Sequence, residues 1–253
     1  MKTIYKTLTI CGDHIESMDY LDGIKMGKRE RIQPIKGKRK QKEIRFDSLF
    51  RTKQKLRRSV WCNEGYLKTF VTLTFADEIK DLKTANKKFH NFIKKMNYRF
   101  PGFAYIGVPE FQKRGVVHYH LLTNVPYIAN EVLRDIWTWG FVGIKALGKI
   151  KNIARYLTKY LTKSSSGQDE RFFNKKKIFY SKNIRRPQIM KDPKEISGYL
   201  EYFGPALKKV YEKELKIDFV GMAVYQLFDV VLDTTFKPTT KSEFEELLKN
   251  MIG

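Results

Sequence analysis

The chain has 253 residues, of which 50 are Lys or Arg and 27 are Asp or Glu, so its formal net charge is +23. Hydrophobic residues make up 42% of it and aromatic residues 14%, which is enough for a core and excludes a wholly disordered chain. No apolar run approaches the roughly 18 residues of a membrane helix, and no signal-peptide pattern opens the sequence. Its two cysteines cannot form a disulfide framework or a four-cysteine zinc site, so we expect a reducing cytoplasm and no membrane.

The positive charge is concentrated in one part of the chain. Residues 25–60 contain 15 Lys or Arg and 3 Asp or Glu, whereas residues 191–253 contain 9 and 11. A charge of this size attracts polyanions, and nucleic acid is the commonest of these. Charge alone does not separate a nucleic-acid-binding protein from a soluble protein that has many lysines.

The N-terminal part predicts a lead, an arm and a helix. Residues 1–24 predict a short, partly ordered lead. Residues 25–44 combine Gly, Pro and a basic run, which is typical of a flexible arm. Residues 45–62 place apolar side chains at helical spacing between Arg and Lys, which predicts an amphipathic basic helix.

The central part predicts alternating strands and helices. A β-favouring run at 70–75 is followed by a helix over 82–98, for which Asp81 is the expected N-cap. Two strand patterns at 103–111 and 116–123 are joined by a short turn that ends in glycine, which predicts an antiparallel hairpin. The remaining predicted elements are a helix over 130–137, a strand over 140–147, a helix over 149–163 and a short strand at 178–181.

This order of elements predicts an α+β fold, in which an antiparallel central sheet of about five strands has helices packed on it. We divide the chain into a basic lead and arm at 1–44, a domain at 45–186 and a helical C-terminal extension at 187–253. The extension is near neutral in charge and its apolar residues recur at helical spacing.

Two of the four histidines lie in one tripeptide on a predicted strand, at His118 and His120. Side chains at i and i+2 share one face of a strand, so both imidazoles can bind one metal ion. Glu110 and Gln112 precede the turn, and the antiparallel return brings their face beside the histidines. Such mixed nitrogen and oxygen ligands suit Mg²⁺ or Mn²⁺ rather than a closed zinc site. We prefer the charged Glu110 as third ligand, with Gln112 as the alternative, and a pair of packed histidines explains the tripeptide equally simply.

The tetrad Tyr-Leu-Thr-Lys occurs twice in succession over residues 156–163. On a helix, Tyr156 and Tyr160 are i, i+4 neighbours, and so are Lys159 and Lys163. A phenol with the usual pKa of about 10 is a poor nucleophile. It becomes useful beside a metal ion that polarises a phosphate, with a cation nearby to favour phenolate. Tyrosines at the border of an amphipathic helix give the same pattern, so the repeat alone does not decide.

Together, three segments resemble the motifs of HUH endonucleases in order and approximate spacing. They are FVTLTF at 70–75, EFQKRGVVHYH at 110–120 and ARYLTKYLTK at 154–163. Over about residues 46–186 the chain is similar to the rolling-circle replication initiators, or Rep proteins, of small phages and bacterial plasmids. The Trp-Thr-Trp-Gly segment at 137–140 is also similar to that group. The resemblance implies the HUH-endonuclease, RRM-like topology and the cytoplasm of a bacterial host cell.

The resemblance also implies an activity, which is metal-dependent cutting of one DNA strand at a replication origin. His118 and His120 are then metal ligands, with Glu110 or Gln112 completing a site for Mg²⁺ or Mn²⁺. The third ligand differs among branches of the family, so the choice between Glu110 and Gln112 stays open.

The paired tyrosines would carry the covalent chemistry implied by the resemblance. Tyr156 would attack first and form a 5′-phosphotyrosine link, and Tyr160 would act in a second, strand-joining step. Lys159 and Lys163 would support the phenolates or the leaving oxygen. In some branches only one tyrosine of such a pair is catalytic, so the number of nucleophiles stays open.

Basic residues outside these motifs are expected to contact DNA phosphates. The implied partners are single-stranded or hairpin origin DNA, with a host polymerase and helicase, and the sequence gives no oligomeric state. The predicted DNA-binding residues are Lys36, Lys38, Arg39, Lys40, Lys42, Arg51, Lys53, Lys55, Arg57, Arg58, Arg171, Lys175, Lys176 and Lys177.

Two other functions remain as alternatives. One is a different HUH enzyme, but relaxases generally place the nucleophile before the histidines, and single-strand transposases are usually shorter with one tyrosine. The other is a non-catalytic nucleic-acid-binding protein, which would use the charge but not the histidines and tyrosines. No GxxxxGK[ST] pattern is present, so we expect no helicase module of that type in this sequence.

Overall fold

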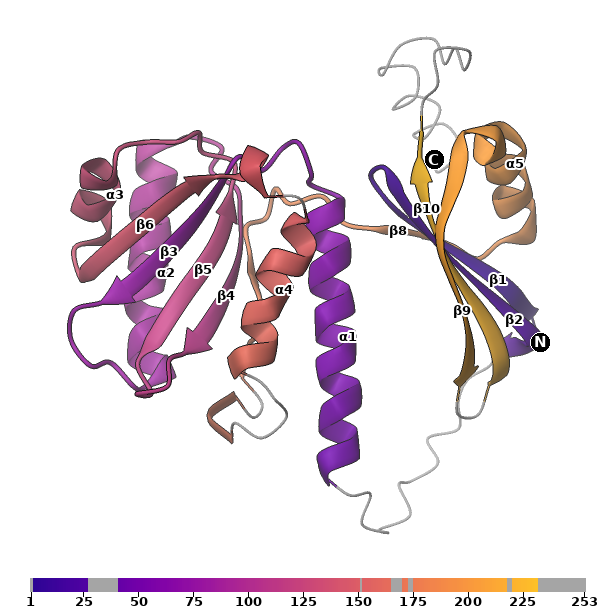
Figure 1. Ribbon diagram of the computed structural model, residues 1–253, viewed down its shortest axis with the longest axis horizontal. Coiled ribbons are helices and arrows are strands. Elements are labelled where there is room, and N and C mark those ends of the chain that lie inside the picture. The colour runs from indigo at the N-terminus through magenta and orange to yellow at the C-terminus, as the bar shows by residue number, and fades with distance from the viewer. Residues whose placement is uncertain are drawn as a thin grey trace. The chain divides into compact units, whose positions relative to one another are not determined.

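The computed structural model describes residues 2–26, 41–150, 152–164, 170–172, 175–217 and 220–231. The chain forms two compact units, one from residues 36–186 and one from the two terminal segments, 1–35 and 187–253 (Figure 1). Each unit contains an antiparallel five-stranded sheet with helix beside it, so the predicted α+β class is confirmed. No helix in these ranges combines the length and hydropathy needed to cross a membrane.

The unit formed by residues 36–186 has the strand order β6-β3-β5-β4-β7, and each neighbouring pair is antiparallel. Its predicted strands and helices are present with bounds close to those expected. They are α1 (Gln41–Trp61), β3 (Thr69–Phe75), α2 (Leu82–Arg99), β4 (Tyr105–Phe111), β5 (Val117–Thr123), α3 (Asn130–Trp137), β6 (Gly140–Ala146), α4 (Ile153–Ser164) and β7 (Phe179–Tyr180), with short 3-10 turns at Leu147–Lys149 and Glu170–Phe172.

Strand alternation gives this sheet two different faces. On one face the core is built on Val71 and Leu73 of β3 and Tyr119 of β5, and α2 and α3 pack against it. Phe89 of α2 stacks on the Tyr119 ring with centroids 4.3 Å apart, and both side chains are fully buried. The side chains one position along each strand therefore point to the opposite face, which α4 contacts through β4 and β5.

Local signals define the ends of the elements that carry this sheet. Asp81 caps α2 as predicted, because its carboxylate accepts the backbone N–H of Thr84 at 2.7 Å. The β4–β5 turn closes with the Gln112 N–H donating to the Val116 carbonyl, and Gly115 adopts a φ of 88°. That left-handed conformation favours glycine and explains why the turn ends in one.

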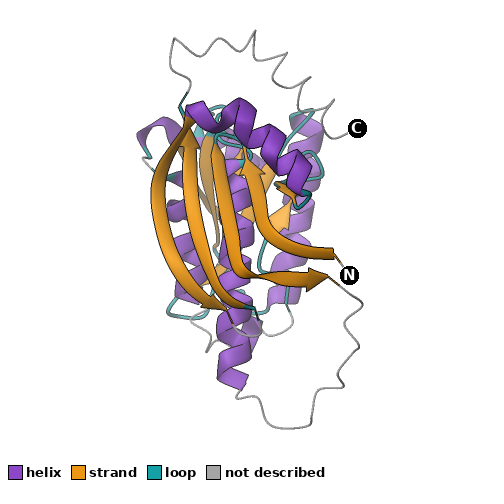
Figure 2. Ribbon diagram, turned by 90° about the vertical axis from the view of Figure 1, so that its right-hand side faces the viewer, coloured by secondary structure: helices purple, strands orange, loops and turns teal. Residues whose placement is uncertain are grey.

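The terminal unit has the strand order β8-β1-β2-β10-β9, and its long strands are visibly curved (Figure 2). Apolar residues of α5 pack on β1 and β2, with Ile196, Tyr199 and Phe203 buried against Leu8 and Ile15. The elements are β1 (Lys2–Cys11), β2 (His14–Met26), β8 (Gln188–Met190), α5 (Pro193–Phe203), a 3-10 turn (Gly204–Ala206), β9 (Leu207–Ile217) and β10 (Gly221–Val230).

This second sheet corrects two predictions. The segment 1–24 is not a partly ordered lead but the β1–β2 hairpin, whose two-residue turn uses Gly12 at a φ of 62°. The extension at 187–253 is helical only over α5, and β9 and β10 follow it. The Lys- and Glu-rich β9 has helical composition, but its pairing with β10, and that of β10 with β2, overrides this local preference. Of the predicted flexible arm at 25–44, residues 27–40 lie outside the described residues and 41–44 begin α1.

We predict that Gly140→Ala destabilises the protein by more than about 2 kcal/mol. Gly140 has a φ of 148°, and a Cβ there would overlap the backbone of Thr74 and Ala76. Gly143→Ala in the same strand is the matched control, because a Cβ there meets nothing within 4 Å. Urea unfolding followed by tryptophan fluorescence measures both variants. Equal stability of the two would contradict the close β6–β3 approach at Gly140.

Candidate active site

The sheet register brings the predicted metal ligands to one face. Glu110 lies directly opposite His118 in the β4–β5 pair. On the other side of β5, His118 lies opposite Thr74 and His120 opposite Thr72. Directly opposed residues of antiparallel strands point to the same face, so these five side chains share the face that α4 contacts.

Both imidazoles are buried, with 6% of His118 and 5% of His120 exposed. Each Nδ1 faces a threonine hydroxyl of β3, at 3.4 Å for His118 and Thr74 and 3.3 Å for His120 and Thr72. Among the described residues, Nε2 of His118 has no hydrogen-bond partner. Burial, followed by the neighbouring His120, lowers the pKa of His118 to about 4, so the ring is neutral near pH 7. A buried neutral imidazole with an unpartnered nitrogen is suited to bind a cation.

Glu110 and Gln112 are placed differently by the structure. The Nε2–H of His120 donates to the Glu110 carboxylate at 2.6 Å. Gln112 lies beyond the end of β4, and its carbonyl oxygen accepts from Arg114 at 3.1 Å. The structure therefore favours Glu110 over Gln112 as the oxygen donor beside the histidines. Within the described ranges, no three His, Cys, Asp or Glu side chains form a ready-made metal site.

Helix α4 presents the paired tyrosines to this face. Asn152 caps the helix, since its side-chain oxygen accepts the Arg155 N–H at 2.7 Å. Leu157 and Leu161 are buried, with 0% and 2% exposed, and they form the apolar row that the sequence predicts. Tyr156 and Tyr160 flank that row and are half-buried (Figure 1 shows α4 in front of β4 and β5).

Tyr160 is held between aromatic rings. Its ring stacks on His120 with centroids 3.7 Å apart and on Phe70 at 5.8 Å. Its hydroxyl donates to the Tyr156 hydroxyl at 3.4 Å. Burial, that hydrogen bond and the nearby charges of Tyr156 and Glu110 raise the pKa of Tyr160 well above its usual value. In this arrangement Tyr160 is a protonated hydrogen-bond donor.

Tyr156 has a more open environment. Phe70 meets its ring edge-on at 4.9 Å, and the Lys159 ammonium lies 3.8 Å from the ring centroid. Tyr156 also lines a cavity of about 450 Å³ together with Tyr127, Lys145, Ala146 and Ile150. Tyr127 is 61% exposed there, so the cavity offers an aromatic surface next to one of the two phenols.

The predicted lysine partners are only partly described. Lys159 lies over both tyrosine rings, at 3.8 Å from Tyr156 and 4.9 Å from Tyr160, rather than beside a phenolic oxygen. The backbone of Lys163 belongs to α4, but its side chain lies outside the described residues. A role for either lysine in supporting a phenolate stays a prediction.

The predicted DNA-binding residues are distributed over several places. Arg51, Lys53, Lys55, Arg57 and Arg58 lie on α1, where Arg57 stacks over Trp61 at 4.7 Å. Arg171 and Lys175 meet at a pocket beside α2, whereas Lys176 lies over Phe179 and Lys177 is half-buried, which lowers its pKa. The calls at Lys36, Lys38, Arg39 and Lys40, and the side chain of Lys42, lie outside the described residues.

Three side chains of the site were not singled out in the sequence. Phe70, Thr72 and Thr74 all belong to β3 and point to the histidine face. The alternation in FVTLTF contains the signal, because residues 70, 72 and 74 share a face. Their partners lie on β5, 44 to 48 positions later for the threonines, and only the register identifies them.

Comparisons with known proteins point to the class of replication proteins. A model of the replication-associated protein family named for ORF2 matches residues 68–165, which include β3, the histidine strand and α4. The chain is also similar to the Phasyl DNA replicon protein arp of Escherichia coli, with 29% identity over 147 residues. That alignment covers 46% of this chain and 50% of the relative, so the chain spans half the length of the curated relative it matches. No solved structure matches.

Both matches support a replication initiator family and a role in the initiation of DNA replication. The family match contains the histidine strand and both tyrosines of α4, so it coincides with the candidate site rather than with the terminal unit.

We predict that Phe70→Ala destabilises the protein by about 3 to 5 kcal/mol. Phe70 is 3% exposed and contacts His120, Tyr156 and Tyr160, so its removal leaves a cavity under both phenols. Phe141→Ala is the control in the same sheet, because that ring is 71% exposed and we expect a change below about 0.5 kcal/mol. Urea unfolding compares the two, and equal effects would contradict the packing described here.

Proposed function

We propose that this chain is a replication initiation protein that nicks and rejoins one strand of origin DNA through a 5′-phosphotyrosine intermediate, starting rolling-circle replication. The observation that carries the proposal is the contact between the tyrosine helix and the histidine strand. Tyr160 stacks on His120 at 3.7 Å, and Tyr156 lies one helical turn away beside an open cavity. A phenol, two imidazoles and a carboxylate on one face are the groups that tyrosine-dependent phosphoryl transfer needs.

Tyr156 is the proposed first nucleophile because it borders the cavity. Its phenolic oxygen attacks the phosphorus of a phosphodiester, and the bond from phosphorus to the 3′ oxygen breaks. The products are a tyrosine ester of the 5′ phosphate and a free 3′-OH, which takes up one proton as Tyr156 gives one up. One negative charge stays on the phosphate, so the exchange conserves charge and bond number. The Lys159 ammonium, 3.8 Å from the Tyr156 ring, favours the phenolate form of that side chain.

His118, His120 and Glu110 are the proposed holders of a divalent cation, Mg²⁺ or Mn²⁺. The donor types fit, because Nε2 of His118 is buried without a partner among the described residues and the Glu110 carboxylate is adjacent. Binding there requires His120 and Glu110 to give up their mutual hydrogen bond of 2.6 Å. The threonine hydroxyls at each Nδ1 then fix the ring orientation. When bound, such an ion polarises a phosphate and stabilises the charge that develops on it.

Tyr160 is the proposed second nucleophile, with a different resting state. It donates its proton to the Tyr156 oxygen at 3.4 Å, so it can return a proton to that oxygen when the Tyr156–phosphate bond is broken. The raised pKa of Tyr160 holds its proton until a strand end arrives. The two tyrosines therefore have distinguishable functions, which separate variants can test.

We expect Tyr156→Phe to abolish the covalent protein–DNA adduct and Tyr160→Phe to keep the adduct but lose strand joining. Purified full-length protein is incubated with labelled single-stranded oligonucleotides from its own replicon, with Mg²⁺ or Mn²⁺ and with EDTA, and analysed on denaturing gels. Tyr98→Phe is the matched control, because Tyr98 is 91% exposed on α2. Tight binding without adduct in the unmodified protein would favour the non-catalytic alternative, and full activity of both single variants would exclude these tyrosines.

We expect Glu110→Gln to weaken Mn²⁺ binding by at least about 10-fold, because the substitution removes the charged oxygen donor beside the histidines. Gln112→Ala is the matched control, since the Gln112 side chain bonds Arg114 instead. Isothermal titration with Mn²⁺ alone measures both variants. A loss of affinity in Gln112→Ala with none in Glu110→Gln would reverse the assignment of the third ligand.

A further inference from the structure

Helix α2 is strongly basic on the side that faces away from the sheet. Residues 82–99 contain six Lys or Arg and no Asp or Glu. The apolar row of the helix, including Phe89 and Phe92, is buried against the sheet, so the cations are left on the outer side. The tyrosine helix α4 contacts the other face of the same sheet, so this charge lies away from the candidate active site.

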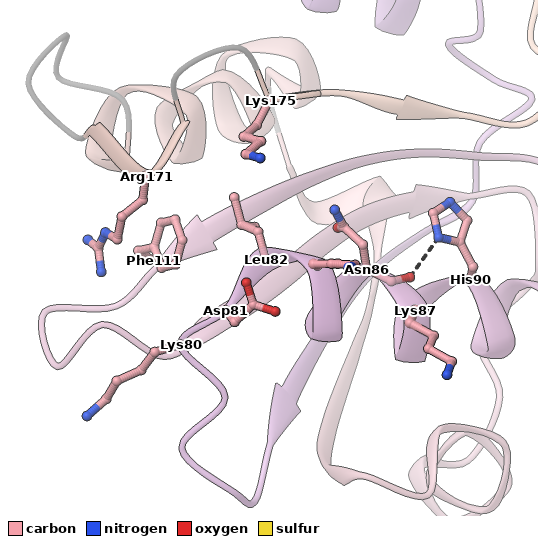
Figure 3. A pocket seen from close by; sticks show the side chains of 10 residues that line it. Lys80, Asp81, Leu82, Asn86, Lys87, His90, Phe111, Arg171 and Lys175 are labelled. Atoms are coloured by element: carbon pink, nitrogen blue, oxygen red, sulfur yellow. Dashed lines mark hydrogen bonds between the residues drawn. The ribbon is translucent and has the colours of Figure 1, made fainter.

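Part of this basic surface is a pocket of about 550 Å³ at the start of α2 (Figure 3). Five of its side chains are cationic and one is a carboxylate, so its field is strongly positive. The lining residues are Lys80, Asp81, Leu82, Lys83, Asn86, Lys87, His90, Phe111, Arg171 and Lys175.

Two of the lining charges are already engaged. The Asp81 carboxylate accepts the Thr84 N–H, and these hydrogen bonds lower the pKa of Asp81. Lys80 pairs with Glu78 at 2.8 Å, on the protein surface. The positive field therefore comes mainly from Lys83 and Lys87 on α2 and from Arg171 and Lys175, which follow α4 in the chain.

Several of the lining groups have defined orientations. The Arg171 guanidinium lies 3.8 Å from the centroid of the Phe111 ring, and Phe111 packs edge-on against Phe172 at 4.8 Å. The Asn86 oxygen accepts the hydroxyl of buried Tyr119 at 2.7 Å, which leaves its NH₂ group as the donor toward the pocket. The His90 ring donates to the Asn86 backbone carbonyl at 2.7 Å (dashed in Figure 3). A planar cation and an oriented amide are suited to phosphate oxygens.

The spacing of the cations favours a chain of phosphates over a single one. Lys83 and Lys87 are i, i+4 neighbours, about 6 Å apart along the helix axis. Like charges at this spacing repel each other and destabilise the helix slightly, and a bound polyanion removes that cost. Arg171 and Lys175 add cations from another segment, so the pocket can contact several successive phosphates.

We propose that this pocket binds the phosphodiester backbone of a single DNA strand outside the scissile segment. The proposal rests on the proposed function only for the identity of the polyanion, since the pocket takes no part in the chemistry. Because it lies on the α2 side of the sheet, the phosphate it holds is not the one that Tyr156 attacks. The sequence-based set of DNA contacts contains Arg171 and Lys175 but none of the α2 lysines.

The test is a triple variant, Lys83→Ala, Lys87→Ala and Lys175→Ala, in the full-length protein. The matched control removes three exposed lysines of β9, at Lys208, Lys213 and Lys216. Fluorescence anisotropy measures the affinity for a labelled single strand of about 30 nucleotides and for a duplex of the same length, over about 50 to 200 mM salt. Thermal unfolding verifies that both variants remain folded.

We expect the slope of log affinity against log salt for the single strand to fall by about 2 in the triple variant, and affinity at low salt to fall at least about 10-fold. The β9 control keeps the original slope. An unchanged slope in the triple variant, an equal fall in the control, or a loss confined to the duplex overturns the proposal.

The adduct assay separates this proposal from the proposed function. A reduced salt slope in the triple variant, in a protein that forms no adduct, supports the pocket and contradicts the nicking activity. Adduct formation with an unchanged slope supports the activity and contradicts the pocket.

Discussion

The antiparallel register of β4, β5 and β3 is the constraint on which the rest of the structure depends. It sets Glu110 opposite His118, and each histidine opposite a threonine of β3. A shift of one residue would turn both imidazoles into the apolar core and expose Tyr119 on the other face. Tyr119 resists that shift, because its ring is stacked on Phe89 and its hydroxyl is bonded to Asn86. The core on one face thus fixes the polar groups on the other.

Helix geometry supplies the second constraint, and it makes two identical side chains different. Tyr156 and Tyr160 are one turn apart on α4, so they meet different parts of the sheet. Tyr160 lies over His120 and Phe70, where burial keeps it protonated, whereas Tyr156 borders a cavity. Because Tyr160 donates its proton to Tyr156, the pair has a direction, and the proposed order of attack follows from that direction.

Local patterns predicted the central unit well, because its strands and helices have clear periods of 2 and 3.6 residues and strong turn and cap residues. The same approach failed at the two ends of the chain. The pairing of β2 with β10 joins residues about 210 positions apart, such as Glu16 and Leu227, and no local pattern records it. Glu110 and Gln112 looked equivalent by alternation, but β4 ends at Phe111 and Gln112 enters the turn. The roles of Phe70, Thr72 and Thr74 likewise depend on register with a distant strand.

The distribution of charge over the two faces of this sheet follows from what each face would have to do. Cations give affinity for any nucleic acid, and that affinity falls steeply with salt, but they do not select one phosphate. The histidine face has few polar groups, and most of them have a defined partner within the sheet or on α4. Such a face can select a phosphate by geometry while contributing little net charge. Placing the lysines of α2 across the sheet keeps non-selective attraction away from the groups that must distinguish one phosphodiester bond from its neighbours.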